Sequence, residues 1–112
     1  MYDAAIIGGG VIGCAIAETL SRYNLKTALI ERENDIADGT TKANSGIVHA
    51  GYDAPEDTLM ARLNLRGSQL MEKECERLDV PYRRVGSYVI SLREEDDGHL
   101  RQLLRRGRKN GA

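Results

Sequence analysis

The sequence predicts an α/β fold that begins with a parallel strand–helix–strand unit. Two short apolar segments, residues 2–7 and 27–30, are typical of strands buried on both faces of a sheet. Between them, from Val11 to about Tyr23, apolar residues recur at helical spacing, and the glycines at 8–10 separate this helix from the first strand. A strand, a helix and a strand within about thirty residues form a βαβ unit with parallel strands.

The next part of the chain predicts a loop, an irregular segment and a second helix. Residues 33–39 are polar, and residues 40–52 are rich in small and hydroxyl side chains, which are common in irregular structure. Pro55 and the two acidic residues after it predict a helix start, because proline and carboxylates favour the first helical turn. We expect one face of this helix to pack in a core, and it carries Leu59, Leu63, Gly67, Leu70, Met71, Cys75 and Leu78.

The last third of the chain predicts two strands and a helix. Residues 80–84 and 87–92 resemble strands joined around Gly86. The acidic residues 94–97 predict the start of a final helix, in which three leucines share one side. Its basic residues predict a solvated helix face: Arg101, Arg105, Arg106, Arg108 and Lys109.

Composition restricts the classes of partner. The chain has 112 residues, 41% of them hydrophobic, which suits one small domain with a packed core. Sixteen basic and 17 acidic residues give a net charge of −1, so we expect no nucleic-acid partner. No apolar run approaches the ~20 residues of a transmembrane helix, and no secretory signal is predicted. Cys14 and Cys75 lack metal-ligand spacing, so we expect buried reduced thiols, no metal site and a cytoplasmic location.

A glycine motif follows the first predicted strand. Gly8, Gly10 and Gly13 fill the three positions of G-x-G-x-x-G. The first allows a tight turn, the second lets backbone approach a pyrophosphate, and the third lets the helix pack on the strand. The helix N-terminus then presents N–H groups and a positive dipole end to phosphate. This context predicts a Rossmann-like dinucleotide site.

An acidic residue follows the second predicted strand, at the spacing that a dinucleotide site requires. Glu31 lies 18 positions after Gly13, where a carboxylate accepts hydrogen bonds from ribose hydroxyls. It disfavours a 2′-phosphate and so excludes NADP, and we place the adjacent Arg32 in the same site. The motif alone does not separate FAD from NAD.

The segment from Thr40 to Tyr52 distinguishes the two cofactors. Its sequence, Thr-Thr-Lys-Ala-Asn-Ser-Gly-Ile-Val-His-Ala-Gly-Tyr, resembles the second flavin-contacting segment of the glycerol-3-phosphate dehydrogenase and D-amino-acid oxidase superfamily. The part from Asn44 to Gly51 is similar to L-2-hydroxyglutarate oxidases and dehydrogenases and to the flavin subunit of anaerobic glycerol-3-phosphate dehydrogenases. The resemblance continues through Gly86-Ser87-Tyr88-Val89-Ile90 and covers nearly the whole chain.

This resemblance implies that the cofactor is FAD. Hydroxyl side chains in the segment suit donation to pyrophosphate or ribityl oxygens, and a lysine suits a phosphate charge or a place near the flavin ring. The cofactor contacts expected here are Thr40, Thr41, Lys42, Asn44, Ser45 and Gly46.

The resemblance also implies an activity, the oxidation of a small hydroxy compound by hydride transfer to flavin. Glycerol 3-phosphate and L-2-hydroxyglutarate are the candidate substrates, and a quinone, an acceptor protein or oxygen would take the electrons. His49 follows Asn44-Ser45-Gly46 within the flavin-contacting segment and is the candidate base for the hydroxyl proton. The alternative is that His49 only packs and forms hydrogen bonds.

The predicted sheet is incomplete, because strands as apolar as 4–7 and 27–30 normally lie inside a larger sheet. We therefore expect residues 1–112 to be the N-terminal part of an FAD-binding domain, inactive alone, with the substrate domain absent. Such a piece is expected to self-associate through its open surfaces. The alternative class is a nucleotide-binding module or inert fragment without turnover.

Overall fold

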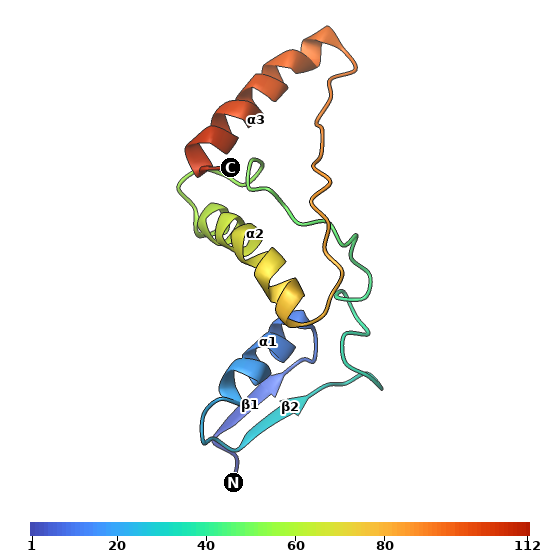
Figure 1. The fold of residues 1–112 in the computed structure, drawn as a ribbon, viewed down its shortest axis with the longest axis vertical. Coiled ribbons are helices and arrows are strands. Elements are labelled where there is room, and N and C mark those ends of the chain that lie inside the picture. The colour runs from blue at the N-terminus through green and yellow to red at the C-terminus, as the bar shows by residue number, and fades with distance from the viewer. The chain divides into compact units, whose positions relative to one another are not determined.

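A computed structural model describes residues 1–112 (Figure 1). The chain forms two compact units, residues 1–47 and residues 48–112, and each is described by itself. None of the helices combines the length and the apolar composition that a membrane crossing requires.

The first unit contains the predicted βαβ arrangement. In chain order its elements are β1 (Ala4–Ile7), α1 (Val11–Leu20) and β2 (Thr27–Ile30). The two strands pair in parallel as a two-stranded sheet, with Ala4 opposite Thr27 and Ile7 opposite Ile30. The predicted α/β class and parallel pairing are therefore confirmed. Because the strands are parallel, their carboxyl ends lie at the same edge of the sheet.

Backbone hydrogen bonds extend the pairing beyond both ends of the sheet. The Asp3 N–H donates to the Lys26 carbonyl at 2.8 Å, and the Gly8 N–H donates to the Ile30 carbonyl at 2.8 Å. Helix α1 ends at Leu20, earlier than the predicted Tyr23. The Tyr23 N–H instead donates to the Leu20 carbonyl at 3.0 Å, a three-residue spacing that closes a tight turn.

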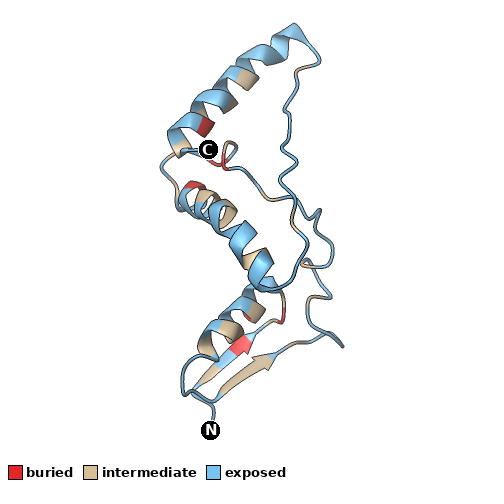
Figure 2. Cartoon of the chain, viewed as in Figure 1, coloured by how far each residue is buried: buried red, intermediate tan, exposed pale blue.

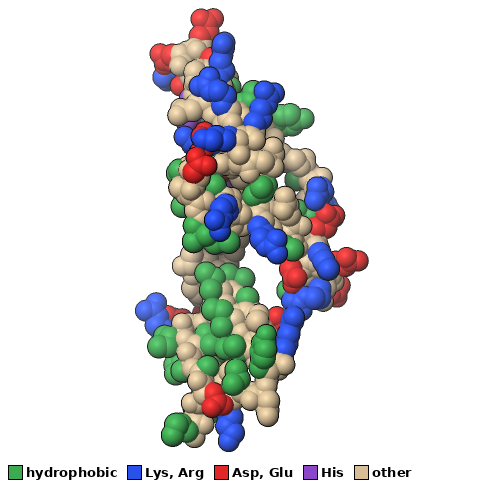
Figure 3. All heavy atoms as spheres, turned by 90° about the vertical axis from the view of Figure 1, so that its left-hand side faces the viewer, with side chains coloured by type: hydrophobic (Ala, Val, Ile, Leu, Met, Phe, Trp, Pro, Cys, Tyr) green, Lys and Arg blue, Asp and Glu red, His purple; other side chains and the backbone are tan.

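The prediction that both strands are buried on both faces is wrong within this chain. Ile6 is 8% exposed, but Ile7 is 87% exposed and Ile30 is 55% exposed. A single helix covers one face of a two-stranded sheet, so side chains that alternate to the other face meet no protein. Figure 2 accordingly shows buried residues as isolated positions, and in Figure 3 hydrophobic side chains gather on the surface of this unit.

The second unit is helical. Its elements are α2 (Leu59–Arg77), the 3₁₀ helix η1 (Glu94–Asp96) and α3 (Asp97–Asn110). The Thr58 hydroxyl caps α2 by accepting from the Ala61 N–H at 3.2 Å, which explains why the helix starts after Pro55 rather than at it. Helix α3 follows the acidic turn as predicted and ends at Gly111, whose φ of 88° suits glycine.

The C-terminal turn of α3 is attached to the segment before α2. The Asn110 side-chain amide donates to the carbonyls of Gly51 at 2.8 Å and Ala54 at 2.9 Å. The Lys109 ammonium lies 2.6 Å from the Glu56 carboxylate and 3.1 Å from that of Asp57, and hydrogen bonding to Glu56 raises the pKa of Lys109. Lys109, one of the basic residues of α3, thus pairs with acidic groups of its own unit.

Three further predictions for the chain are wrong. Residues 80–92 contain no strand, because these residues have no hydrogen-bonded neighbour to form a ladder with. The apolar face of α2 is not a core: Leu59 is 61% exposed and Leu63 is 56% exposed. Both cysteines are free but only half-buried, since no second layer covers the helices that carry them.

Candidate functional site

The glycine loop between β1 and α1 has a conformation that side chains would obstruct. Gly8 has a φ of +103°, which L-residues rarely adopt. A Cβ on Gly13 would lie 1.9 Å from the Gly8 carbonyl oxygen, so α1 approaches the strand only because Gly13 has no side chain. The two outer glycines of the motif therefore serve the turn and the helix–strand contact that their spacing predicts.

The N-terminus of α1 opens beside this loop. Gly10 is the N-cap residue and offers no side chain to the first turn. The Val11 N–H donates to the Thr41 hydroxyl at 3.0 Å, while the N–H groups of Ile12 and Gly13 have no acceptor in the chain. Free N–H groups and the positive end of the helix dipole together favour an anion at this position.

The Glu31 carboxylate lies next to the glycine loop. One oxygen, Oε2, accepts from the Gly9 N–H at 2.5 Å, and Oε1 accepts from the N–H groups of Arg32 at 2.8 Å and Glu33 at 3.0 Å. The hydrogen bonds from Glu33 and then Gly9 lower the pKa of Glu31. The group is therefore ionised near neutral pH and is fixed at the carboxyl end of β2.

The segment after β2 returns to the glycine loop. The Ala37 N–H donates to the Gly9 carbonyl at 2.9 Å, and the Thr41 contact with Val11 adds a second attachment. An open groove of about 550 Å³ lies between this segment, the carboxyl end of β1 and the N-terminus of α1. The groove is lined by Ile6, Ile7, Gly8, Gly10, Val11, Ile12, Gly13, Ile16, Thr40, Thr41 and Asn44.

The structure therefore brings together six of the predicted cofactor contacts, namely Gly8, Gly10, Gly13, Thr40, Thr41 and Asn44. Asn44 is held by local bonds, donating to the Thr41 carbonyl and accepting from the Gly46 N–H.

The other predicted residues have different surroundings. Lys42 pairs with Asp38 at 2.7 Å, and Arg32 pairs with Glu33 at 2.9 Å, both at exposed positions. Ser45 is exposed. His49 belongs to the second unit, where its Nδ1 lies 3.6 Å from the Asp53 carboxylate. Its role stays a prediction.

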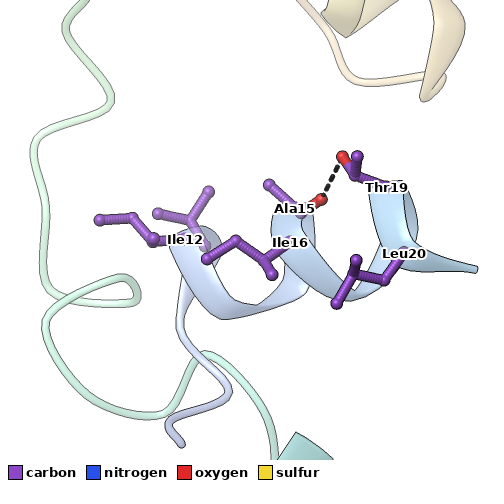
Figure 4. A pocket seen from close by; sticks show the side chains of 6 residues that line it. Ile12, Ala15, Ile16, Thr19 and Leu20 are labelled. Atoms are coloured by element: carbon purple, nitrogen blue, oxygen red, sulfur yellow. Dashed lines mark hydrogen bonds between the residues drawn. The ribbon is translucent and has the colours of Figure 1, made fainter. Parts of the chain in front are cut away.

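A second hollow on the first unit differs in chemistry. About 430 Å³ lies over the exposed side of α1 (Figure 4), lined by Val11, Ile12, Ala15, Ile16, Thr19 and Leu20. The only polar side chain there, Thr19, donates its hydroxyl to the Ala15 carbonyl at 2.9 Å. This surface offers nothing to orient a charged nucleotide and is an uncovered apolar helix face.

Gly9 is a residue of this site that the sequence motif does not assign. It is buried, its N–H binds Glu31, and its carbonyl accepts from Ala37. The motif leaves its position variable, so only the run of three consecutive glycines signals that a side chain is excluded there.

The fold and this groove define a dinucleotide-binding protein of the βαβ type. The family model described as "FAD dependent oxidoreductase" matches residues 3–112, and the chain belongs to this family. The cofactor of the family is FAD, so the expectation of FAD rather than NAD is confirmed.

Individual relatives agree with the family. The glycerol 3-phosphate dehydrogenase of Caloramator mitchellensis is 51% identical over 112 residues, which are 100% of this chain and 23% of the relative. The mitochondrial L-2-hydroxyglutarate dehydrogenase of Dictyostelium discoideum is 36% identical over 114 residues, covering 100% of this chain and 26% of the relative.

A solved structure is also similar. The dithionite-reduced L-α-glycerophosphate oxidase of Mycoplasma pneumoniae, with FAD bound, has a TM-score of 0.85 and 34% identity. The match covers 99% of this chain and 29% of that one. The chain thus spans about a quarter of the length of the relatives it matches.

Proposed function

We propose that this chain supplies the adenosine- and pyrophosphate-binding part of an FAD-dependent dehydrogenase or oxidase. Residues 1–112 then form the N-terminal part of its cofactor domain, and a later part of the polypeptide supplies the substrate domain. The substrate is a small hydroxy compound. Glycerol 3-phosphate is the first candidate and L-2-hydroxyglutarate the second, because the relative named for glycerol 3-phosphate is the more similar of the two.

The observation that carries the proposal is the groove at the N-terminus of α1. It combines unpaired helix N–H groups with a glycine loop and with hydroxyl groups from Thr40 and Thr41. A pyrophosphate requires these donors and a close backbone approach. The ionised Glu31 carboxylate at the next strand end has the charge and position to accept hydrogen bonds from the adenosine ribose.

The residues present fit FAD at its nucleotide half. Gly10 leaves room for the diphosphate, and the N–H groups of Ile12 and Gly13 face no competing acceptor. FAD, when bound, supplies an acceptor for the hydride that leaves a hydroxyl-bearing carbon.

His49 is our candidate for the group that accepts the hydroxyl proton. Its imidazole is exposed, and Nδ1 lies 3.6 Å from the Asp53 carboxylate. A quinone, an acceptor protein or oxygen then takes the electrons.

The test is the flavin content of the complete flavoprotein carrying Gly10→Val. A Cβ at Gly10 lies 3.2 Å from the Thr41 hydroxyl, and the valine methyl groups would obstruct the diphosphate. We expect the purified variant to lose the flavin absorption bands. The control is Gly39→Ala, since a Cβ at Gly39 meets nothing within 4 Å. Full flavin content in Gly10→Val would contradict the assignment.

A further inference from the structure

Gly9 connects three segments of the first unit. Its N–H donates to Glu31 Oε2 at 2.5 Å, after β2. Its carbonyl accepts from the Ala37 N–H at 2.9 Å and from the Cys14 thiol at 3.3 Å. Both polar groups of this buried residue therefore have partners that lie outside the glycine loop.

A side chain at this position would be crowded. A Cβ on Gly9 would lie 3.1 Å from Glu31 Oε2, 3.1 Å from Ile36 Cγ2 and 3.3 Å from Leu29 Cδ2. All three distances are shorter than ordinary van der Waals contact, which begins at 3.4 Å. The two shortest of these distances involve the Glu31 carboxylate and Ile36, so these two side chains must shift most to admit a Cβ.

We propose that Gly9 is a positioning residue, which fixes the Glu31 carboxylate through its N–H group so that the carboxylate can read the ribose of the bound nucleotide. This inference rests on the proposed function, because it assigns the ribose to Glu31. It adds that the selectivity of the site for a ribose that carries its 2′-hydroxyl depends on the Gly9 N–H, through the orientation that this group gives to the Glu31 carboxylate.

The physical argument concerns the direction of the carboxylate. Three backbone N–H groups hold the two oxygens of Glu31. Two of them occupy Oε1, so Oε2, which accepts only from Gly9, keeps a lone pair for a ligand hydroxyl. A Cβ on Gly9 lies 3.1 Å from Oε2 and therefore pushes this oxygen away, which weakens the one bond that comes from the glycine loop. The bonds from Arg32 and Glu33 remain, so the carboxylate turns toward its own strand end and away from the groove.

The experiment compares ADP with 2′-deoxy-ADP on the apoprotein of the complete flavoprotein. In the wild type we expect ADP to bind about tenfold tighter, the effect of one hydrogen bond to a charged group. In Gly9→Ala the ratio of the two affinities should fall below about twofold, whereas Gly39→Ala should retain the wild-type ratio. A merely structural role for Gly9 would weaken both ligands equally and leave the ratio unchanged, which would overturn the proposal.

A second variant covers the case in which Gly9→Ala does not fold. Ile36→Ala combined with Gly9→Ala removes the Ile36 methyl group that a Cβ would meet at 3.1 Å but keeps the clash with Glu31. This double variant should also lose the preference for ADP, while Ile36→Ala alone should keep it. If the wild type itself binds neither nucleotide, the proposed function fails. If the wild type prefers ADP and the double variant does too, only the role of Gly9 fails.

Discussion

The Thr41 hydroxyl accepts a hydrogen bond of 3.0 Å from the backbone N–H of Val11, a residue 30 positions earlier in the chain. Val11 is the first residue of α1, so this bond joins the flavin segment to the helix that the glycine loop begins. The two parts of the proposed cofactor site are therefore aligned within the protein itself. Preorganised donors of this kind reduce the ordering that ligand binding requires.

Replacing Thr41 by valine should loosen this alignment. Valine keeps the volume of threonine but leaves the Val11 N–H without an acceptor, as the loss of a helix cap does. We expect a loss of about 1 kcal/mol in the stability of the first turn, seen as faster hydrogen exchange of the Val11 amide. Thr40→Val is the matched control, because Thr40 lines the same groove while the Val11 N–H bonds Thr41. Unchanged exchange at Val11 would show that the contact is unimportant.

The Glu31 hydrogen bonds predict a response to acid. The pKa of Glu31 is lowered from its ordinary value of 4.5, mainly by the Glu33 N–H and then by that of Gly9. A lowered folded-state pKa means that the ionised group stabilises the loop above 4.5, and this stabilisation is lost as pH falls through the lowered value. Hydrogen exchange of the Gly9 amide should therefore lose protection below 4.5 in the wild type. Glu31→Gln should show no such acid transition, and an identical transition in both proteins would contradict this origin.

Much of this site follows from sequence because it depends on short-range geometry. The spacing of Gly8 and Gly13 predicts the turn and the close helix approach, and Glu31 follows from the length of one βαβ unit. The attachment of Thr41 to Val11 is not visible in any local pattern, since it joins segments 30 residues apart. The predicted burial of Ile7 fails for a related reason, because burial depends on layers that one sheet pair and one helix do not provide.

His49 is the least constrained of the predicted residues, and kinetics can test it. We expect His49→Gln in the complete flavoprotein to keep its flavin but to reduce it with substrate at least ~10²-fold more slowly, as for loss of a positioned base. Stopped-flow absorbance isolates this step from reoxidation. His99→Gln is the control, since His99 lies on the exposed surface of α3. A wild-type rate of flavin reduction in His49→Gln would return His49 to a packing role.

The apolar face of α1 predicts how the 112-residue chain behaves in solution. Ile12 is 73% exposed and Ile16 is 45% exposed, next to an open sheet edge. We expect concentration-dependent self-association in sedimentation velocity, because such a surface is costly to leave in water. Ile16→Lys should weaken it, and Ile47→Lys, at a position 71% exposed outside this face, should not. A monomer at all concentrations would argue against this.

Binding of FAD to the glycine loop is the central claim, and its most direct test is a titration of the chain followed by backbone amide chemical shifts. The sheet has only two strands, so we expect binding weaker than micromolar, in fast exchange. The shifting amides should be those of residues 8–14 and 40–46 together with Glu31, while the amides of α3 stay in place. Absence of any shift at saturating FAD, or shifts that avoid the glycine loop, would contradict the account.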